Sequence, residues 1–459
     1  MQSRPGARRI SPAACPSARW RCRPRRWKGC WIKDATAARR AALQMLDAVR
    51  AGATLQRARD GPLANLIERD RRLAYELAAG VLRRRAQLDR LLELATVDPR
   101  LHDVLRLGAY QLRALARVPP YAAVSTSVEL ARELAGERAA GYVNRMLRQL
   151  SRDAGCGMRD AGETHPRWLI ERWRRRFGHA ETERLMAWND SRAPLTLQAA
   201  RWDAATLRTR LTEAGFGVRE APFGAGVVVE TGATHPASRI PPPAQLPGYA
   251  EGGFVVQDPA HALVCRFAAI PPGTVVYDAC AAPGGKAVAL ERGGARVMAG
   301  DARRERVGRL VETARRAGVA IRVAVADLLA APFRSEALAA VLVDAPCSAT
   351  GTMARHPDAR WRVAPRTIAR AAQRQRSLLA AAATLVRSGG LLVYATCSLE
   401  PEENSDIVID FLAHHPQFTR VPATGAVSAA LLTPAGDFQS LPQRHGMDGA
   451  YAARLARVR

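Results

Sequence analysis

The stretch Asp278-Ala-Cys-Ala-Ala-Pro-Gly-Gly-Lys286 decides the fold of this chain. Residues 274–277 before it are apolar and rich in β-formers, as in a buried strand, and residues 287–290 after it start a helix. A strand, a glycine-rich turn and a helix bring backbone N–H groups close to a ligand. The turn matches neither G-x-G-x-x-G nor the P-loop pattern. It therefore predicts an α/β ligand-binding domain of another kind.

Acidic residues end the next strands along the chain. Asp301, Asp327 and Asp344 each follow a short apolar run, and Asp301 comes 23 residues after Asp278, where a ribose-binding acid is expected. The carboxyl ends of strands in an open α/β sheet share one edge, so these carboxylates are expected to meet in one crevice. Any single aspartate could merely cap the next helix, but the series favours a nucleotide site.

Two cysteines follow strands on the same predicted edge. Cys347 lies in Asp344-Ala-Pro-Cys347-Ser, and Cys397 lies in Ala395-Thr-Cys397-Ser. A thiol that ionises near neutral pH is the most nucleophilic of side chains. Lone cysteines in apolar runs are usually small buried hydrophobes, and this is the preferred interpretation for Cys265 and Cys280. The two serine-flanked cysteines fit that interpretation less well.

These motifs resemble the Sun-type RNA cytosine-5 methyltransferases. The resemblance covers nearly everything from about residue 35 to the C-terminus, and it is strongest with the bacterial members that act on 16S rRNA. Besides the turn at 278–286, it is carried by Asp344-Ala-Pro-Cys347-Ser, Arg355-His-Pro-Asp-Ala-Arg-Trp361 and Ala395-Thr-Cys397-Ser-Leu-Glu-Pro-Glu-Glu-Asn404.

The resemblance implies S-adenosylmethionine as the cofactor, bound across the strand edge of a seven-stranded Rossmann-like methyltransferase domain. Asp301 is then expected at the ribose hydroxyls, Asp327 beside the adenine and Asp344 also within the cofactor site. The turn against the methionine end is expected to consist of Cys280, Ala281, Ala282, Pro283, Gly284, Gly285 and Lys286.

The resemblance also assigns catalytic roles. Cytosine C5 is a poor nucleophile, so a thiolate first adds to C6 and makes C5 enamine-like. The family assigns this attack to Cys397 and assisted release of the product to Cys347. Asp344 is expected to hydrogen-bond the cytosine N3/N4 edge, and Lys286 to add positive potential that favours thiolate.

The remaining motif residues have weaker assignments. Arg355, His356 and Asp358 are expected to shape a loop beside the target base, where Trp361 either stacks on the base or packs under the loop. The acidic residues after Cys397 are expected to stabilise the N-terminus of the following helix rather than to catalyse. They are Glu400, Glu402 and Glu403, with Asn404 beside them.

The chain divides into four segments. Residues 1–34 form a basic tail that is expected to be disordered, and residues 35–152 show helical spacing of apolar residues and resemble the RNA-binding antitermination factor NusB. Residues 153–250 form a connector and a small α/β RNA-recognition-like unit, and residues 251–459 form the methyltransferase domain. Arg83 to Arg85 are candidates for phosphate contacts, with a solvated basic face as the alternative.

Composition sets limits on partners and location. The net charge of +27 favours a polyanionic partner, although 66 of the 69 basic residues are arginine, as in a chain with a compositional bias. That bias makes Lys286 informative. No run of about 18 apolar residues could span a membrane, and the scattered cysteines and histidines suggest a reducing cytoplasm and no metal site. The expected partner is 16S rRNA, free or in early assembly, and the chain is expected to be a monomer.

Other functions remain open. The same chemistry could act on tRNA, although the NusB-like segment favours rRNA. DNA cytosine methylation would make Cys347 the attacking residue and leave Cys397 unexplained. A non-catalytic RNA-binding adaptor is the third alternative, supported by three departures from the family pattern at Gln198, Ala200 and Ala349.

Overall fold

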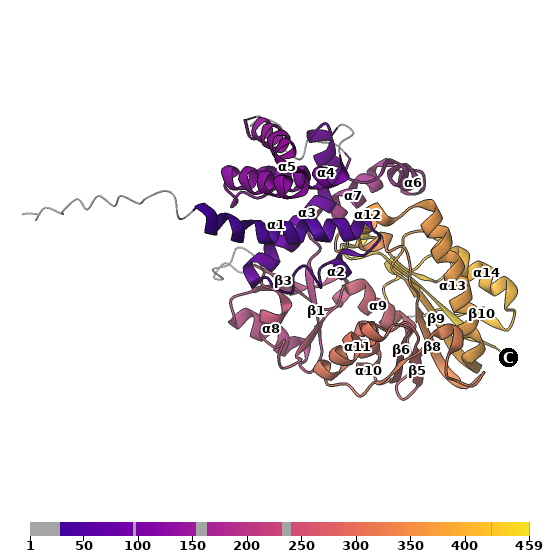
Figure 1. Ribbon diagram of the computed structural model, residues 1–459. Coiled ribbons are helices and arrows are strands. Elements are labelled where there is room, and N and C mark those ends of the chain that lie inside the picture. Colours follow the sequence, from indigo (N-terminus) through magenta and orange to yellow (C-terminus); the bar gives the residue numbers. More distant parts are fainter. Residues whose placement is uncertain (1–27, 95–97, 153–162, 232–239, 424, 459) are drawn as a thin grey trace, which may run out of the picture.

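The computed structural model describes residues 28–94, 98–152, 163–231, 240–423 and 425–458, with side chains from residue 36 onward. The expected basic tail, with its cysteines, lies outside the described side chains. Figure 1 shows three parts, namely a group of N-terminal helices, a small sheet beside them, and a large sheet with helices on both faces. This arrangement confirms the predicted fold class.

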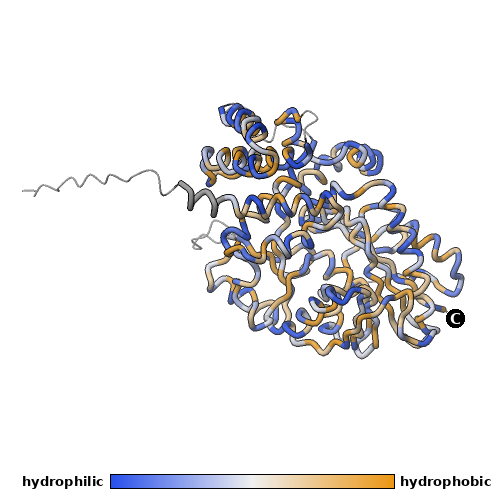
Figure 2. The backbone as a smooth tube through the Cα atoms, in the orientation of Figure 1, coloured by the Kyte–Doolittle hydropathy of each residue, from blue (hydrophilic) through white to orange (hydrophobic). Residues whose placement is uncertain are grey.

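The N-terminal part is all helical, because leucine and alanine recur at helical spacing and pack into one core. Gly136, with φ +80°, interrupts the last helix, a backbone angle that glycine adopts without strain. Figure 2 shows the resulting alternation of hydrophilic and hydrophobic residues along these helices. The helices are α1 (Lys28–Arg50), α2 (Leu55–Ala58), α3 (Glu68–Leu91), α4 (Pro99–Ala114) and α5 (Pro120–Arg152).

A connector of two helices leads to the small sheet. The sheet is antiparallel with strand order β2-β3-β1-β4, and α8 packs its leucines against it. Strand β4 pairs with β1, so the segment that leads into the methyltransferase domain first completes this sheet. The elements are α6 (Arg167–Phe177), α7 (His179–Asp190), β1 (Leu195–Ala199), α8 (Ala204–Glu213), β2 (Gly217–Glu220), β3 (Val227–Glu230) and β4 (Phe254–Val256).

The large sheet has the strand order β10-β12-β9-β8-β5-β6-β7, and β11 pairs with β12 outside this path. The expected seven strands are therefore joined by an eighth. The strands from β9 to β7 are parallel, and β10, β11 and β12 pair antiparallel. They are β5 (Val275–Asp278), β6 (Arg296–Asp301), β7 (Arg322–Val325), β8 (Leu338–Asp344), β9 (Val386–Thr396), β10 (Phe418–Arg420), β11 (Phe438–Ser440) and β12 (Ala450–Arg457).

Alternate residues of the central strands pack on opposite helix layers. Val276 and Leu342 belong to the core under α9, α10 and α11, whereas Tyr277 and Val343 belong to the core under α13 and α14. The helices of this part are α9 (Pro259–Ala268), α10 (Gly285–Arg292), α11 (Arg304–Ala317), α12 (Ala359–Arg362), α13 (Pro365–Leu385), α14 (Ser405–His414) and α15 (Pro442–His445).

The chain runs from β5 outward through β6 and β7, and then returns to the other side of β5 through β8 and β9. The carboxyl ends of β5 and β8 therefore flank the point where the strand order reverses, which is where open α/β sheets bind ligands. None of the helices in the described residues is both long and apolar enough to cross a bilayer.

Candidate active site at the carboxyl edge of the large sheet

The glycine-rich turn lies between the end of β5 and the start of α10. Gly284 has φ +107°, and a Cβ built there would lie 2.7 Å from a methyl group of Leu310, so only glycine fits. The turn is attached to the neighbouring strand, because the Ala281 N–H donates to the Gly300 carbonyl at 2.9 Å. The backbone of the turn is thereby fixed at the edge where β5, β6 and β8 end.

Asp278, the last residue of β5, is fully buried, and neither of its carboxylate oxygens has a hydrogen-bond partner. Burial, followed by the charge of Asp344, raises the pKa of Asp278 to about 7. An unpartnered buried carboxylate is costly unless a ligand supplies donors. In the sequence, Asp278 is the residue that begins the turn. Its burial without a partner identifies it as an additional residue of the candidate site.

Asp301 ends β6 and is also buried. Its Oδ1 accepts a hydrogen bond from the Arg303 N–H at 3.1 Å, and its Oδ2 lies 3.2 Å from Arg306 Nη1. The other terminal nitrogen of Arg306 donates to the Ala282 carbonyl in the turn at 2.6 Å. Arg306, which the sequence did not single out, therefore joins the turn to the end of β6.

Asp327 lies two residues beyond β7 and has a local partner. Its Oδ1 accepts from the Leu329 N–H at 3.1 Å, so it caps the short helix Leu328–Ala330. Asp327 therefore caps a short helix, and its expected place beside the adenine stays a prediction. The charges of Asp278, Asp327 and Asp301 all act on Tyr277 in β5, so these carboxylates share one edge of the sheet.

Lys286 lies in the first turn of α10 and forms an ion pair with the end of β8. Its Nζ lies 2.6 Å from Asp344 Oδ2 and 3.1 Å from His261 Nδ1. Burial lowers the pKa of Lys286, but Asp344 outweighs burial and the net shift is upward. Burial and the charge of Lys286 lower the pKa of His261 well below its usual value, so a neutral ring accepts from the ammonium group. His261, in α9, carries no signal in the sequence.

The two serine-flanked cysteines meet beside this ion pair. Asp344 of β8 is the register partner of Ala395 in β9, so the loops after these strands leave the sheet together. The Sγ atoms of Cys347 and Cys397 are 3.1 Å apart, and both cysteines are partly exposed. The hydrogen bond with Cys397, followed by burial, raises the pKa of Cys347 well above its usual value. The two thiols therefore act on each other directly.

Cys265 and Cys280 have a different environment. Burial raises the pKa of each thiol to about 12. Cys265 packs against the core formed with α10 and lies near the Lys286 carbonyl. Both cysteines therefore lack thiolate character, as the sequence suggested.

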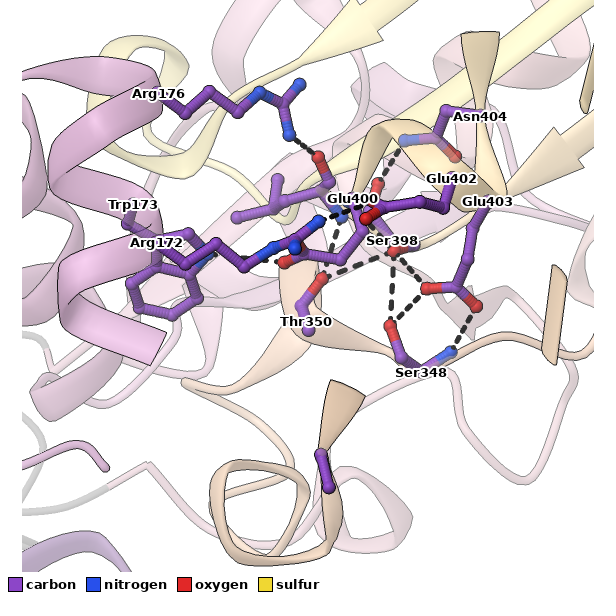
Figure 3. A network of polar contacts seen from close by, with 12 residues as sticks. Arg172, Trp173, Arg176, Ser348, Thr350, Ser398, Glu400, Glu402, Glu403 and Asn404 are labelled. Atoms are coloured by element: carbon purple, nitrogen blue, oxygen red, sulfur yellow. Dashed lines mark hydrogen bonds and ion pairs between the residues drawn. The ribbon is translucent and has the colours of Figure 1, made fainter. Parts of the chain in front are cut away.

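The acidic residues after Cys397 lie at the start of the short helix Pro401–Glu403 that precedes α14, where the sequence predicted a helix N-terminus. Their side chains also join the catalytic loops to other elements, which the sequence did not predict. Glu400 and Glu402 accept hydrogen bonds from Arg172 of α6, and Glu400 also accepts from Trp173 Nε1 at 3.2 Å. Glu403 bonds to Ser348 and Ser398, the residues that follow the two cysteines. Figure 3 shows this network between α6 and the two loops.

Residues 355–361 connect the loop after Cys347 to neighbouring parts of the molecule. Arg355 pairs with Asp258 at 2.6 Å and with Asp448 at 2.8 Å, which ties the loop after Cys347 to α9 and to the turn before β12. Trp361 Nε1 donates to the Leu82 carbonyl of α3 at 2.6 Å, and its ring packs on the helical core. The packing alternative therefore holds for Trp361, although its partner is the N-terminal part of the molecule.

The arginines of α3 face the same junction. Arg83 donates to the Ala354 carbonyl at 3.3 Å, Arg84 bonds to Gln87 at 3.1 Å, and the Arg85 guanidinium lies 5.0 Å from the centre of the Trp361 ring. These contacts hold the three arginines at the junction, and the Arg85 side chain is still 37% exposed. Contacts of Arg83 to Arg85 with phosphate stay a prediction.

The structure shows the local environment of the three residues that depart from the family pattern, Ala349, Gln198 and Ala200. Ala349 has φ +60° in the left-handed region, which glycine adopts at lower energy than alanine. Gln198 turns inward and donates to the Ala225 carbonyl at 2.8 Å, and Ala200 is fully buried. Among the described residues, no group of three or more His, Cys, Asp or Glu side chains is placed to hold a metal ion.

Comparisons with known proteins agree with this architecture. Family models match three successive segments, namely NusB over residues 36–152, a ferredoxin-like domain of RsmF/B-like methyltransferases over 165–234, and 16S rRNA methyltransferase RsmB/F over 269–456. The crystal structure of PH0851 superposes with a TM-score of 0.75 at 23% identity, covering 92% of this chain and 98% of that one. NSun6 from Pyrococcus horikoshii, solved with SFG, superposes with a TM-score of 0.55 at 18% identity, covering 64% and 98%.

Relatives match over almost their whole length. The ribosomal RNA small subunit methyltransferase B of Klebsiella pneumoniae is 34% identical over 422 residues, which are 85% of this chain and 91% of the relative. The protein of the same name from Vibrio cholerae is 32% identical over 438 residues, covering 91% and 96%. The chain therefore belongs to the 16S rRNA methyltransferase family RsmB/F.

Proposed function

We propose that this enzyme transfers a methyl group from S-adenosylmethionine to C5 of a cytosine in 16S rRNA, through a covalent bond between Cys397 and C6 of the base. The observation that carries the proposal is the pair of sulfur atoms, 3.1 Å apart, beside the Lys286–Asp344 ion pair. A methyltransferase that acts on oxygen or on an amine has no need of two thiols. A pyrimidine carbon needs one thiol to activate it and one group to assist release.

The residues at the sheet edge fit S-adenosylmethionine. Asp278 offers two buried carboxylate oxygens without partners, and Gly284, with φ +107°, shapes the turn beside them. Asp301, Asp327 and Asp344 would hold the cofactor together with the turn from Cys280 to Lys286. When bound, S-adenosylmethionine supplies an electrophilic methyl group. The fold is shared with NSun6 of Pyrococcus horikoshii, whose crystals held SFG, an analogue of S-adenosylmethionine.

The chain's own residues account for the remaining steps. The Cys397 thiolate forms a bond to C6, and the electron pair of the C5–C6 double bond moves so that C5 acts as the nucleophile. After C5 is methylated, it loses its proton to a base, the double bond re-forms, and the C6–S bond breaks with its electron pair returning to sulfur. Cys347, whose sulfur lies 3.1 Å from that of Cys397, is placed to exchange a proton during release.

Asp344 would orient the base while Lys286 holds Asp344. One carboxylate oxygen of Asp344 is occupied by Lys286, and the side chain is 31% exposed at the mouth of the site. A carboxylate there can accept a hydrogen bond from the N4 amino group and so orient the base. The ion pair with the buried lysine fixes the direction of this carboxylate.

The RNA would lie across several parts of the chain. We propose the division at residues 1–34, 35–152, 153–250 and 251–459, with the helical part and the small sheet adding affinity for rRNA. The curated relatives in Klebsiella pneumoniae and Vibrio cholerae are named for the small-subunit rRNA, which favours rRNA over tRNA. A monomeric state and a cytoplasmic location stay predictions from the sequence.

The test is denaturing gel electrophoresis of Cys347→Ala and Cys397→Ala variants incubated with 16S rRNA and S-adenosylmethionine. Cys397→Ala is expected to abolish methylation and to form no adduct. Cys347→Ala is expected to form the bond to C6 but to release it slowly, so that a slow-migrating, RNase-sensitive band accumulates.

Other outcomes would decide between the alternatives. An adduct with Cys397→Ala alone would reverse the two roles and favour the DNA-type assignment. Methylation of tRNA but not of 16S rRNA would change the substrate and leave the chemistry intact. If the unmodified protein methylates no RNA and forms no adduct, the non-catalytic adaptor becomes the better explanation.

A further inference from the structure

One buried side chain holds the two cysteine loops together. Glu403 is fully buried, and its Oε1 accepts hydrogen bonds from the Ser348 N–H at 2.8 Å and from Gln375 Nε2 at 3.0 Å. Its Oε2 accepts from the Ser398 hydroxyl at 2.5 Å and from the Ser348 hydroxyl. Ser348 follows Cys347 and Ser398 follows Cys397, so a single carboxylate spans both loops (Figure 3).

The backbone at this position is fixed as firmly as the side chain. The Glu403 carbonyl accepts from the Tyr394 hydroxyl at 2.6 Å. The next residue, Asn404, donates to the Ser398 carbonyl at 2.8 Å and accepts from the Thr396 hydroxyl at 2.5 Å. The backbone of Glu403 is therefore held in place beside the two loops.

Burial raises the pKa of Glu403, and the hydrogen bonds from Ser348, Ser398 and Gln375 oppose that rise. All the hydrogen bonds at its two oxygens can be donated by its partners, which is the arrangement of a carboxylate rather than of a carboxylic acid. The charge of Glu403, with that of Cys397, is among those that act on Cys347. The charge of Glu403 opposes a second negative charge at Cys347.

We propose that Glu403 is a positioning residue that keeps the two sulfur atoms together and keeps the proton of the pair on Cys347. This inference rests on the proposed function for its meaning in catalysis, because the division of labour between the cysteines requires one thiol and one thiolate. It makes Glu403 responsible for which cysteine can attack. The two cysteines then differ in reactivity because of the neighbouring carboxylate, and no difference between the cysteine residues themselves is needed.

The substitution Glu403→Gln removes the negative charge of the side chain while its hydrogen bonds can be kept. A glutamine amide oxygen can accept from the Ser348 N–H and from Gln375, and its NH₂ group can donate to the serine hydroxyl oxygens. The network therefore keeps its bonds while the negative charge is lost. The matched control is Asp406→Asn, which removes the same charge from an exposed residue of α14.

The experiment uses the free full-length protein and iodoacetamide as the probe, without RNA or S-adenosylmethionine. Alkylation of Cys347 and of Cys397 is followed by peptide mass spectrometry between about pH 6.5 and pH 9.5, where thiols titrate. In the unmodified protein, Cys397 is expected to react first. In Glu403→Gln, the rate at Cys347 is expected to rise about threefold to tenfold near neutral pH, since one pKa unit is a factor of ten. Asp406→Asn is expected to behave as the unmodified protein.

Three results would overturn the inference. They are faster alkylation of Cys347 than of Cys397 in the unmodified protein, an unchanged rate at Cys347 in Glu403→Gln, and a matching rise in Asp406→Asn. If Glu403→Gln does not fold, Ser398→Ala serves instead. It removes a donor and leaves the charge, so a rise at Cys347 would contradict the inference. Alkylation needs no substrate, so its failure is distinguishable from a failure of methyl transfer.

Discussion

Asp278 shows how a single residue links the free protein to its ligand. Its carboxylate is buried without a partner, and burial raises its pKa from the ordinary value of 3.8 to about 7. Between about pH 4 and pH 7, the carboxyl group of Asp278 is therefore protonated in the folded free protein and ionised in the unfolded chain. A ligand that donates hydrogen bonds to this carboxylate would relieve the cost of its ionisation.

This shift predicts a pH dependence of stability in the free protein. Because the folded state binds more protons between about pH 4 and pH 7, the contribution of Asp278 to stability falls as pH rises through that window. Above it, the ionised group costs at most about 4 kcal/mol, from about three pKa units. Asp278→Asn is expected to be more stable than the unmodified protein near pH 8, and no more stable near pH 4, in urea titrations.

The informative quantity is the difference between the two stability curves, because Asp448, with a pKa raised to about 7 by burial and by Asp258, contributes to both. Asp406→Asn, an exposed residue, serves as the control for loss of a charge. Parallel curves for Asp278→Asn and the unmodified protein would mean that Asp278 has a partner in solution.

Among elements, α6 has a role that its sequence did not reveal. Trp173 of this helix is fully buried in a core with residues of the methyltransferase domain. The partner of the helix is the loop after Cys397. Arg172 pairs with Glu400 and Glu402, and Arg176 donates to the Leu399 carbonyl. The connector helix therefore supports the catalytic loop from the side opposite Glu403.

We predict that Arg172→Gln destabilises the protein by about 3 kcal/mol, because it leaves the buried carboxylate of Glu400 without its ionic partner. Glu400 is 0% exposed and Arg172 is 26% exposed. The matched control on the same helix is Arg167→Gln, which breaks an ion pair whose arginine is 88% exposed. It is expected to cost at most about 0.5 kcal/mol. Equal losses in chemical denaturation would show that the Arg172 pair is solvated.

At the scale of the whole molecule, the N-terminal helices are docked on the methyltransferase domain next to the active site. Arg360 of α12 is fully buried, pairs with Asp190 at 2.9 Å, and donates to the carbonyls of Arg83 and Asn189 at 3.0 and 2.9 Å. With Trp361 it joins α3, α7 and the loop after Cys347. The helices and the catalytic loops are therefore expected to unfold cooperatively.

Removal of Arg360 tests this coupling. Arg360→Met fills the space but removes the closer ion pair of Asp190, which keeps only Arg84 at 3.5 Å, and the donor to two carbonyls. It is therefore expected to lower the free energy of unfolding by about 3 kcal/mol. In calorimetry, a single transition is expected to separate into two as the docking weakens. Arg370→Met, at an exposed position of α13, is expected to change stability by no more than about 0.5 kcal/mol. An unchanged single transition in Arg360→Met would contradict the coupling.

The sequence by itself determined the order of the parts and the edge at which the chemistry lies. The run before Asp278, the turn and the start of α10 are local patterns, because strand and helix periods, glycine and proline act over a few residues. Asp301 and Asp344 could be placed because each ends a strand, and all ends of parallel strands share one edge. The strong family motifs added the cofactor and the roles of the two cysteines as predictions.

Only the tertiary structure decided what these residues contact. Cys347 and Cys397 meet because β8 and β9 are adjacent and their ends are in register, a pairing that no local pattern specifies. The side-chain partners of the acidic residues after Cys397 have the same explanation. Glu400 follows a rule for helix N-termini in sequence, but its charge is balanced by Arg172, 228 residues away. A buried charge needs such a long-range partner, because the free energy lost by an unpaired charge inside the protein exceeds the free energy gained from a local helix preference.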